Sequence, residues 1–140
     1  MTGNADDWRL FLAVPLPEAV KTRILEIESV PAISALPLRF VDPDRAHITL
    51  HFLGATPPER AELIALSLQQ AFSRQRGAHL STGELGLYPG ARKPRVLWLG
   101  IDGDTADLGV LHRKAGEALL QMGMDIERRA FQAHITIGRV

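Results

Sequence analysis

Apolar and polar residues alternate in two short segments of the chain, one in the first half and one at the C-terminal end. The first begins at His47 and the second at His134. Alternate residues of a strand point to the same face, so each segment predicts a strand with one polar and one apolar face. In the first strand, we expect the apolar face to lie in a core, and it carries Ile48, Leu50 and Phe52.

The polar faces of the two strands have the same composition, a histidine followed two positions later by a threonine. His47 and Thr49 form one pair, and His134 and Thr136 form the other. Imidazole has an unperturbed pKa of about 6.5, so it can accept or donate a proton near neutral pH. The sequence therefore indicates one acid and one base supplied by two related strands.

This repetition extends beyond the two short segments. A strand is expected over 9–14 and another over 95–101, and each is followed by a helical stretch that leads to a motif histidine. The separation between Arg9 and His47 is 38 positions, and that between Arg95 and His134 is 39. The spacing predicts a duplicated strand–helix–strand unit. An approximate two-fold axis between the copies would bring the histidines to face each other across a groove.

Capping and turn residues predict the ends of the helices. Pro17 is expected in the first turn of one helix, and Thr56 is expected to cap a second one in a capping box with Glu59. Asp104 or Thr105 can cap a third. The three helices should bury apolar stripes, which are Val20, Ile24 and Ile27; Ala61, Ile64, Ala65, Leu68 and Phe72; and Leu108, Leu111, Ala115, Leu119 and Met122.

Turn chemistry also predicts how the first motif is reached. A short strand is expected over 38–41, and residues 42–45 have a composition typical of a turn. We therefore expect a hairpin that delivers the His47 strand. An extended segment is expected over 78–88, with bends at Gly83 and Gly86.

Composition limits the class of protein. The 140 residues contain 16 basic and 16 acidic side chains and no cysteine. Balanced charge argues against binding of a long polyanion by charge alone, and the lack of cysteine excludes disulfides and thiolate metal sites. The first residues are polar and acidic, and no apolar run approaches the ~20 residues that cross a bilayer. We expect one domain, located in the cytoplasm and without a membrane segment.

Four stretches carry a resemblance to a known family, namely 9–17, 47–54, 85–100 and 131–140. In this order they resemble the two-histidine (2H) phosphoesterase superfamily, and within it the bacterial and archaeal RNA 2′,3′-cyclic phosphodiesterases, also called 2′-5′ RNA ligases. The resemblance implies a bilobed α+β fold, with pseudo-two-fold symmetry, in which two antiparallel sheets line a central groove and helices lie outside. Relatives carry a further strand-forming tail after the second motif. We therefore expect a single domain over 1–140, built of two lobes and lacking that tail.

The resemblance also implies a reaction and its residues. It implies hydrolysis of 2′,3′-cyclic phosphate ends of RNA to a 2′-phosphate without a metal or cofactor, with His134 as the base and His47 as the acid. Thr49 and Thr136 would donate to phosphoryl oxygens, and Arg139 is implied to lie near the phosphate. Simple alternation would place Arg139 on the opposite face from Thr136, so a bulge or a strand end is required.

Further substrate-binding candidates surround these residues. His51 shares the predicted face of His47 and Thr49, and we interpret it as a solvated residue on the rim of the groove. Tyr88 and Trp98 can stack on a base, although the apolar neighbours of Trp98 favour a core position for it. Arg92 and Arg95 either attract the RNA strand or belong to a solvated basic loop.

Other functions remain open at this point. The chain could be a non-catalytic module that binds nucleotides or RNA ends, or a metal hydrolase that uses His47, His51 and His134. The metal hydrolase is disfavoured, because neither motif contains a carboxylate. RNA ends or cyclic nucleotides are the expected partners, and no obligate protein partner is indicated. Joining of RNA ends through a 2′-5′ linkage is a possible reverse reaction.

Overall fold

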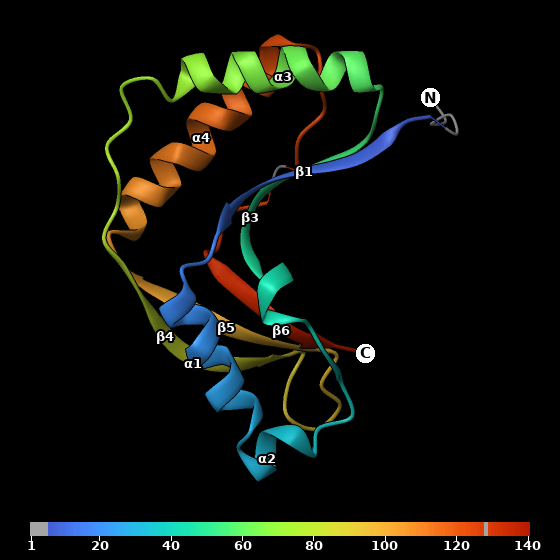
Figure 1. Cartoon of the computed structure of the whole chain (residues 1–140), viewed down its shortest axis with the longest axis vertical. Coiled ribbons are helices and arrows are strands. Elements are labelled where there is room, and N and C mark those ends of the chain that lie inside the picture. The colour runs from blue at the N-terminus through green and yellow to red at the C-terminus, as the bar shows by residue number, and fades with distance from the viewer. Residues whose placement is uncertain (1–5, 128) are drawn as a thin grey trace. The chain divides into compact units, whose positions relative to one another are not determined.

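The computed structural model describes residues 6–127 and 129–140, which form helices and β-sheets (Figure 1). The chain divides into two compact units, each assembled from three segments. Unit 1 consists of the described part of 1–13 with 49–79 and 104–132, and unit 2 consists of 14–48, 80–103 and 133–140. In chain order the elements are β1 (Trp8–Pro15), α1 (Glu18–Glu28), α2 (Pro31–Ser34), β2 (Arg39–Phe40), the 3₁₀ turn η1 (Pro43–Arg45), β3 (His47–Thr56), α3 (Pro58–Ala71), β4 (Leu80–Tyr88), β5 (Val96–Gly103), α4 (Thr105–Gln121) and β6 (His134–Arg139).

Unit 2 is built on a four-stranded sheet with the order β2-β6-β5-β4, in which every neighbouring pair is antiparallel. One face of this sheet is apolar and buried, and Figure 1 shows α1 lying across the sheet. The helix contributes two buried side chains of the predicted stripe, Ile24 and Ile27. The buried residues of the central strands are Leu97, Leu99, Ile135 and Ile137. Burial of this face leaves the alternate residues of β5 and β6 on the other face.

Unit 1 contains most of a two-stranded sheet, β1-β3, and the pair of helices α3 and α4. The two predicted stripes meet in its core, where Ile64 and Leu68 of α3 are buried with Ala115 and Leu119 of α4. The guanidinium of Arg60 on α3 also donates a hydrogen bond to the carbonyl oxygen of Met122, just after α4. The stripes of these two helices are therefore confirmed at these four positions, whereas Ala65 of the predicted α3 stripe is exposed.

The strand–helix–strand order expected from the repeat is present twice, as β1–α1–β3 and as β5–α4–β6. In each copy the two strands are hydrogen-bonded neighbours in one sheet. The helices are exchanged, because α1 belongs to unit 2 with β5 and β6, whereas α4 belongs to unit 1 with most of β1 and β3. Each unit therefore contains elements of both repeats.

The predicted hairpin before the first motif is wrong. β2 pairs with β6, not with β3, and Arg39 and Phe40 lie opposite Arg139 and Gly138. After the intervening 3₁₀ turn, β3 pairs with β1 in the two-stranded sheet. Pairing with a strand almost one hundred residues away is a tertiary choice that the local turn composition does not reveal.

Alternation along β3 also differs from the prediction. Ile48 and Leu50 are buried as expected, but Phe52 is 68% exposed and His51 is only 3% exposed. The next residue, Leu53, packs against the core of α3 and α4. The assignment of Phe52 to a core is therefore wrong, because the second half of β3 buries the opposite set of residues against the helices.

The N-caps of α1, α3 and α4 differ in part from the predicted ones. Thr56 ends β3 and its hydroxyl donates to the carbonyl oxygen of Gly54 at 3.2 Å, so the capping box is wrong and Pro57 occupies the N-cap of α3. Pro17 is likewise the N-cap of α1, one position before the first turn. Asp104 is the N-cap of α4, but its carboxylate accepts from the backbone N–H of His79 at 3.0 Å.

In the described part of the chain, no helix combines the length and apolar character that crossing a bilayer requires.

Candidate functional site

The second motif lies on β6, between β2 and β5 in the sheet of unit 2. His134 begins the strand and is exposed, and Thr136 is half-buried. Gly100 of β5 lies opposite His134, and Trp98 lies opposite Thr136. Residues directly opposite on antiparallel strands project from the same face. His134 and Thr136 therefore occupy the face that is not buried beneath α1.

A bulge in β6 places Arg139 on this same face. Leu97 lies opposite Gly138 while its neighbour Trp98 lies opposite Thr136, so Ile137 is an extra residue on β6. Beyond the bulge, Arg139 lies opposite Val96. Val96 and Trp98 are alternate residues of β5 and share a face. The bulge required for Arg139 is thus present, and we call the face that carries His134, Thr136 and Arg139 the motif face.

The first motif begins β3, and the ring of His47 has a defined orientation. Nδ1 of His47 lies 2.7 Å from the carbonyl oxygen of Arg45. A carbonyl oxygen only accepts hydrogen bonds, so Nδ1 carries the proton and donates it. In the neutral ring, Nε2 then holds the lone pair and can accept a proton. Thr49 follows two residues later on the same strand and is half-buried.

The segment that leads to His47 is attached to β6. The backbone N–H of Val41 donates to the carbonyl oxygen of Ile137 at 2.6 Å, which continues the pairing of β2 with β6. From Val41 the chain passes through η1 to His47. Both motif histidines accordingly belong to unit 2.

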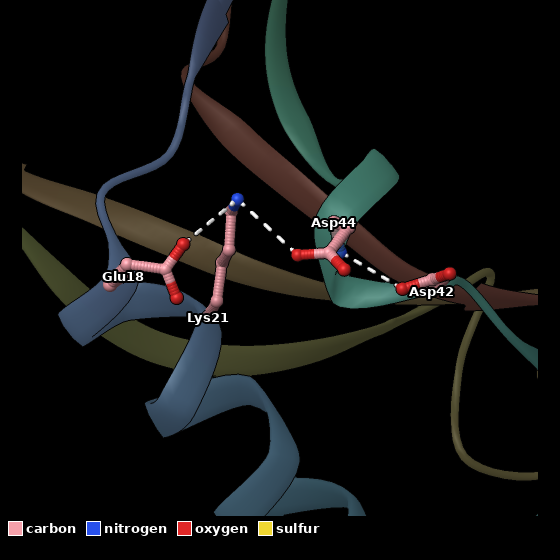
Figure 2. A network of polar contacts seen from close by, with 4 residues as sticks. All are labelled: Glu18, Lys21, Asp42 and Asp44. Carbon is pink, nitrogen blue, oxygen red and sulfur yellow. Dashed lines mark hydrogen bonds and ion pairs between the residues drawn. The ribbon is translucent and has the colours of Figure 1, made fainter.

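A polar network joins α1 to the turn before His47 (Figure 2). The ammonium group of Lys21 lies 3.4 Å from a carboxylate oxygen of Glu18 and 3.4 Å from one of Asp44. The carboxylate of Asp42 accepts from the backbone N–H of Asp44 at 3.0 Å. Hydrogen bonding to Asp44, and then to Glu18, raises the pKa of Lys21. Burial, with a smaller contribution from Asp42, raises the pKa of Glu28 at the end of α1.

Two aromatic residues also lie on the motif face. Tyr88 lies opposite Val96 and is 64% exposed, and Trp98 is half-buried beside Thr136. The indole of Trp98 covers Gly86, its partner on β4, since a Cβ atom there would overlap the ring. The interpretation of Trp98 as a core residue is therefore wrong. Its alternation with buried Leu97 and Leu99 is the signal that could have indicated this.

Replacement of Gly86 by alanine should displace the Trp98 indole from β4. We expect a loss of about 1–3 kcal/mol in the free energy of unfolding, because the added methyl group must push the ring aside. Urea unfolding monitored by circular dichroism measures this loss. Gly90→Ala is a matched control, since a Cβ atom at that position has no neighbour within 4 Å. Equal stability of the two variants would contradict the packing described for Trp98.

The basic loop between β4 and β5 brings two further candidates into unit 2. Arg92 and Arg95 are both exposed. The loop is closed at its base, where the backbone N–H of Arg95 donates to the carbonyl oxygen of Tyr88 at 2.7 Å. The carbonyl oxygen of Arg95 in turn accepts from the backbone N–H of Val140 at 3.0 Å, just after β6. Substrate binding by either arginine stays a prediction.

His51 is not a solvated rim residue, and that interpretation is wrong. Its side chain belongs to unit 1, where Nε2 donates to the carbonyl oxygen of His112 at 2.8 Å. The rings of His51 and His112 stack with their centroids 4.1 Å apart, and His112 stacks on Phe131 at 4.4 Å. Gly116 provides room for the stack, because a Cβ atom there would lie 3.3 Å from Cε1 of His51. These contacts describe a packing role for His51.

The stacked histidines predict a pH dependence of stability. Burial, with a smaller contribution from His51, lowers the pKa of His112. Below the ordinary histidine pKa of about 6.5, the unfolded chain therefore binds more protons at this position than the folded chain, and stability falls as the pH falls. His112→Phe keeps a planar ring and should reduce this slope in urea unfolding between pH 7.5 and 5.5. His79→Phe, at an exposed position outside the stack, should not; an unchanged slope in His112→Phe would contradict this prediction.

The alternative metal site required His51 as a ligand together with the two motif histidines. Nε2 of that ring is engaged by the His112 carbonyl, and the side chain is buried. Over residues 6–127 and 129–140, no three His, Cys, Asp or Glu side chains gather closely enough to hold a metal ion. The geometry therefore gives no support to this alternative.

Comparison with known proteins relates the chain to several phosphodiesterases. It is 35% identical to the RNA 2′,3′-cyclic phosphodiesterase of Geobacillus stearothermophilus over 92% of its own length, and it spans 41% of that protein. It is 29% identical to the protein of the same name from Aeropyrum pernix, covering 84% of the chain and 66% of the relative. The identity to the Bacillus subtilis protein of this name is 30%, and the match covers 92% of this chain and 69% of that protein. The chain thus spans about two fifths to two thirds of these relatives.

Solved structures agree with these similarities. Escherichia coli LigT complexed with 3′-AMP superposes with a TM-score of 0.74 at 27% identity, covering 95% of this chain and 73% of LigT. TT0787 of Thermus thermophilus gives a TM-score of 0.75 at 26% identity, and the match covers 94% of this chain and 74% of TT0787. The α+β architecture expected from the resemblance is therefore confirmed. The family described as LigT-like phosphoesterase matches residues 14–98, and the chain belongs to this family.

Proposed function

We propose that this chain hydrolyses the 2′,3′-cyclic phosphate at the end of an RNA to a 2′-phosphate. The observation that carries the proposal is the motif face, where His134, Thr136 and Arg139 project together because of the bulge at Ile137. The name shared by the relatives, RNA 2′,3′-cyclic phosphodiesterase, supports the same reaction. The RNA end and cyclic nucleotides are then the substrates of this site.

In the proposed reaction, two imidazoles transfer protons on either side of one phosphorus atom. His134 accepts a proton from water, and the resulting hydroxide attacks the phosphorus. The bond from phosphorus to the 3′ oxygen breaks, and the imidazolium form of His47 donates its Nε2 proton to that oxygen. The products are a 2′-phosphate and a 3′ hydroxyl, so one water molecule is consumed. The Nδ1 hydrogen bond of His47 supports its role, since it directs the other ring nitrogen to proton transfer.

Charge on the non-bridging oxygens requires hydrogen-bond donors that are in place before the reaction. Thr49 and Thr136 each follow a motif histidine by two positions and supply hydroxyl donors. Arg139 adds a guanidinium, which binds phosphate oxygens in a bidentate manner. Tyr88, Arg92 and Arg95 are proposed to contact the remainder of the RNA. His51 is excluded from these substrate-binding candidates, because its side chain is buried in unit 1.

The second candidate function is a module that binds RNA ends without turnover. Presence of both His-Thr pairs favours the enzyme, since binding alone does not require an acid and a base. Ligation through a 2′-5′ linkage would use the same groups in the reverse direction.

Incubation with a 2′,3′-cyclic mononucleotide distinguishes the two functions. We expect the wild-type protein to release a 2′-phosphate with multiple turnovers in the presence of excess chelator. Chromatographic separation of the 2′ and 3′ isomers identifies which bond breaks. Binding of the nucleotide without product would support the module, and a 3′-phosphate product would contradict the proposed direction of attack.

A further inference from the structure

Two arginines face each other across neighbouring strands of unit 2. Arg39 of β2 lies directly opposite Arg139 of β6. Side chains in such a pair project from one face with their Cβ atoms about 4.5–5.5 Å apart, and like charges in this arrangement destabilise a sheet. Arg39 is therefore on the motif face, although its sequence context did not indicate a functional role.

The charge of this pair is not balanced by neighbouring carboxylates. Both side chains are exposed, and among the described residues neither takes part in an ion pair. A third basic residue, Arg95, is attached to the same end of the sheet through the hydrogen bond from Val140. A same-sign pair without a protein counterion indicates a site for an anion. Guanidinium groups bind phosphate oxygens through paired hydrogen bonds.

The position of the pair relates it to the second motif. Trp98 and Val96, the β5 partners of Thr136 and Arg139, are two residues apart. At about 3.3 Å per residue, the arginine pair is about 7 Å along the sheet from Thr136. Arg39 lies one strand further from β5, at about 4.8 Å from Arg139. This displacement suits a phosphate group next to the one undergoing reaction.

We propose that Arg39 is a substrate-binding residue that holds the phosphodiester group preceding the cyclic end of the RNA. Arg139 lies between this group and the reacting phosphate. The inference rests on the proposed function and adds a preference, because an oligonucleotide has the second phosphate and a cyclic mononucleotide does not. Arg39 thus contributes to discrimination between RNA ends and free cyclic nucleotides.

The test compares two substrates in three variants. The substrates are a 2′,3′-cyclic mononucleotide and a trinucleotide that ends in a 2′,3′-cyclic phosphate. Arg39→Gln should raise KM for the trinucleotide about tenfold or more, the effect expected for a lost hydrogen bond to a charged group, and leave the mononucleotide unchanged. Arg39→Lys keeps the charge, so its KM for the trinucleotide should lie between those of the wild type and Arg39→Gln. Arg23→Gln removes the same charge from an exposed position on α1 and should affect neither substrate.

Folding is controlled in the same experiment. Relief of the like-charge pair should leave the thermal unfolding midpoint of Arg39→Gln equal to or above that of the wild type. A lower midpoint would contradict the unbalanced pair from which the site is inferred. An equal rise in KM for both substrates would overturn the assignment to a second phosphate, as would no rise for either.

Failure of the proposed function gives a different result. If the wild type turns over neither substrate, the hydrolytic proposal fails while the anion site is still tested by binding. Fluorescence anisotropy with a labelled trinucleotide carrying a terminal phosphate then measures Kd. A weaker Kd in Arg39→Gln but not in Arg23→Gln supports the site. Equal Kd values in the wild type and Arg39→Gln overturn it.

Discussion

Replacement of either motif histidine by alanine should lower kcat for hydrolysis of a 2′,3′-cyclic phosphate by roughly 10²- to 10⁴-fold, the contribution typical of a positioned acid or base. His47→Ala removes the ring that is oriented by the carbonyl oxygen of Arg45, and His134→Ala removes the first residue of β6. Because the two groups act in one step, the double variant should lose little more than either single variant. Initial rates with a 2′,3′-cyclic oligonucleotide measure these effects.

His79→Ala is the matched control, because this histidine is exposed and precedes β4. Its turnover should equal that of the wild type. The wild-type rate should also fall on both the acidic and the basic side of an optimum, and each single variant should lose one side of the profile. Near-normal turnover in His47→Ala or His134→Ala, with the fold intact by circular dichroism, would refute the paired acid and base.

Replacement of Thr136 by valine should lower kcat by roughly 10²- to 10³-fold, as does the loss of one oxyanion donor in other enzymes. Valine has nearly the same shape and is compatible with a strand, so only the hydroxyl donor is removed. Charge on the phosphoryl oxygens grows in the transition state, so the loss should fall on kcat more than on KM. Thr49→Val should behave in the same way if the two motifs are equivalent.

Thr82→Val provides the control for this substitution. Thr82 lies opposite Ile101, an alternate neighbour of the buried Leu99, so it is on the other face of the same sheet. Its activity should be unchanged. A rise in KM with unchanged kcat for Thr136→Val would show that the hydroxyl contributes only to ground-state binding, and this result would contradict the role in the transition state.

Local patterns predicted much of the secondary structure, because alternation and helical periodicity are properties of consecutive residues. The strand over 9–14 appears as β1, and the apolar stripe with Ile64 and Leu68 is buried in α3 as expected. Gly83 lies between Thr82 and Leu85, where the register of β4 against β5 shifts. These features depend on the local backbone and on which side of an element is apolar.

Predictions that depended on partners were less successful. The turn composition at 42–45 was compatible with a hairpin of β2 and β3, but β2 pairs with β6. His51 shares the strand and the predicted face of His47, yet its ring is buried in a stack with His112 of α4 and Phe131. Conversely, Arg39 had no motif around it, and only its position opposite Arg139 indicates a site.

The sequence by itself determined the two His-Thr pairs, the repeated strand–helix–strand order and the alternation at the start of each motif strand, where Ile48, Leu50 and Ile135 are buried. Only the tertiary structure decided that an extra residue at Ile137 brings Arg139 to the face of Thr136, and that Arg39 joins it there. The physical reason is that alternation is set by bonds within one strand. Register, bulges and strand neighbours are instead set by hydrogen bonds between segments that are distant along the chain.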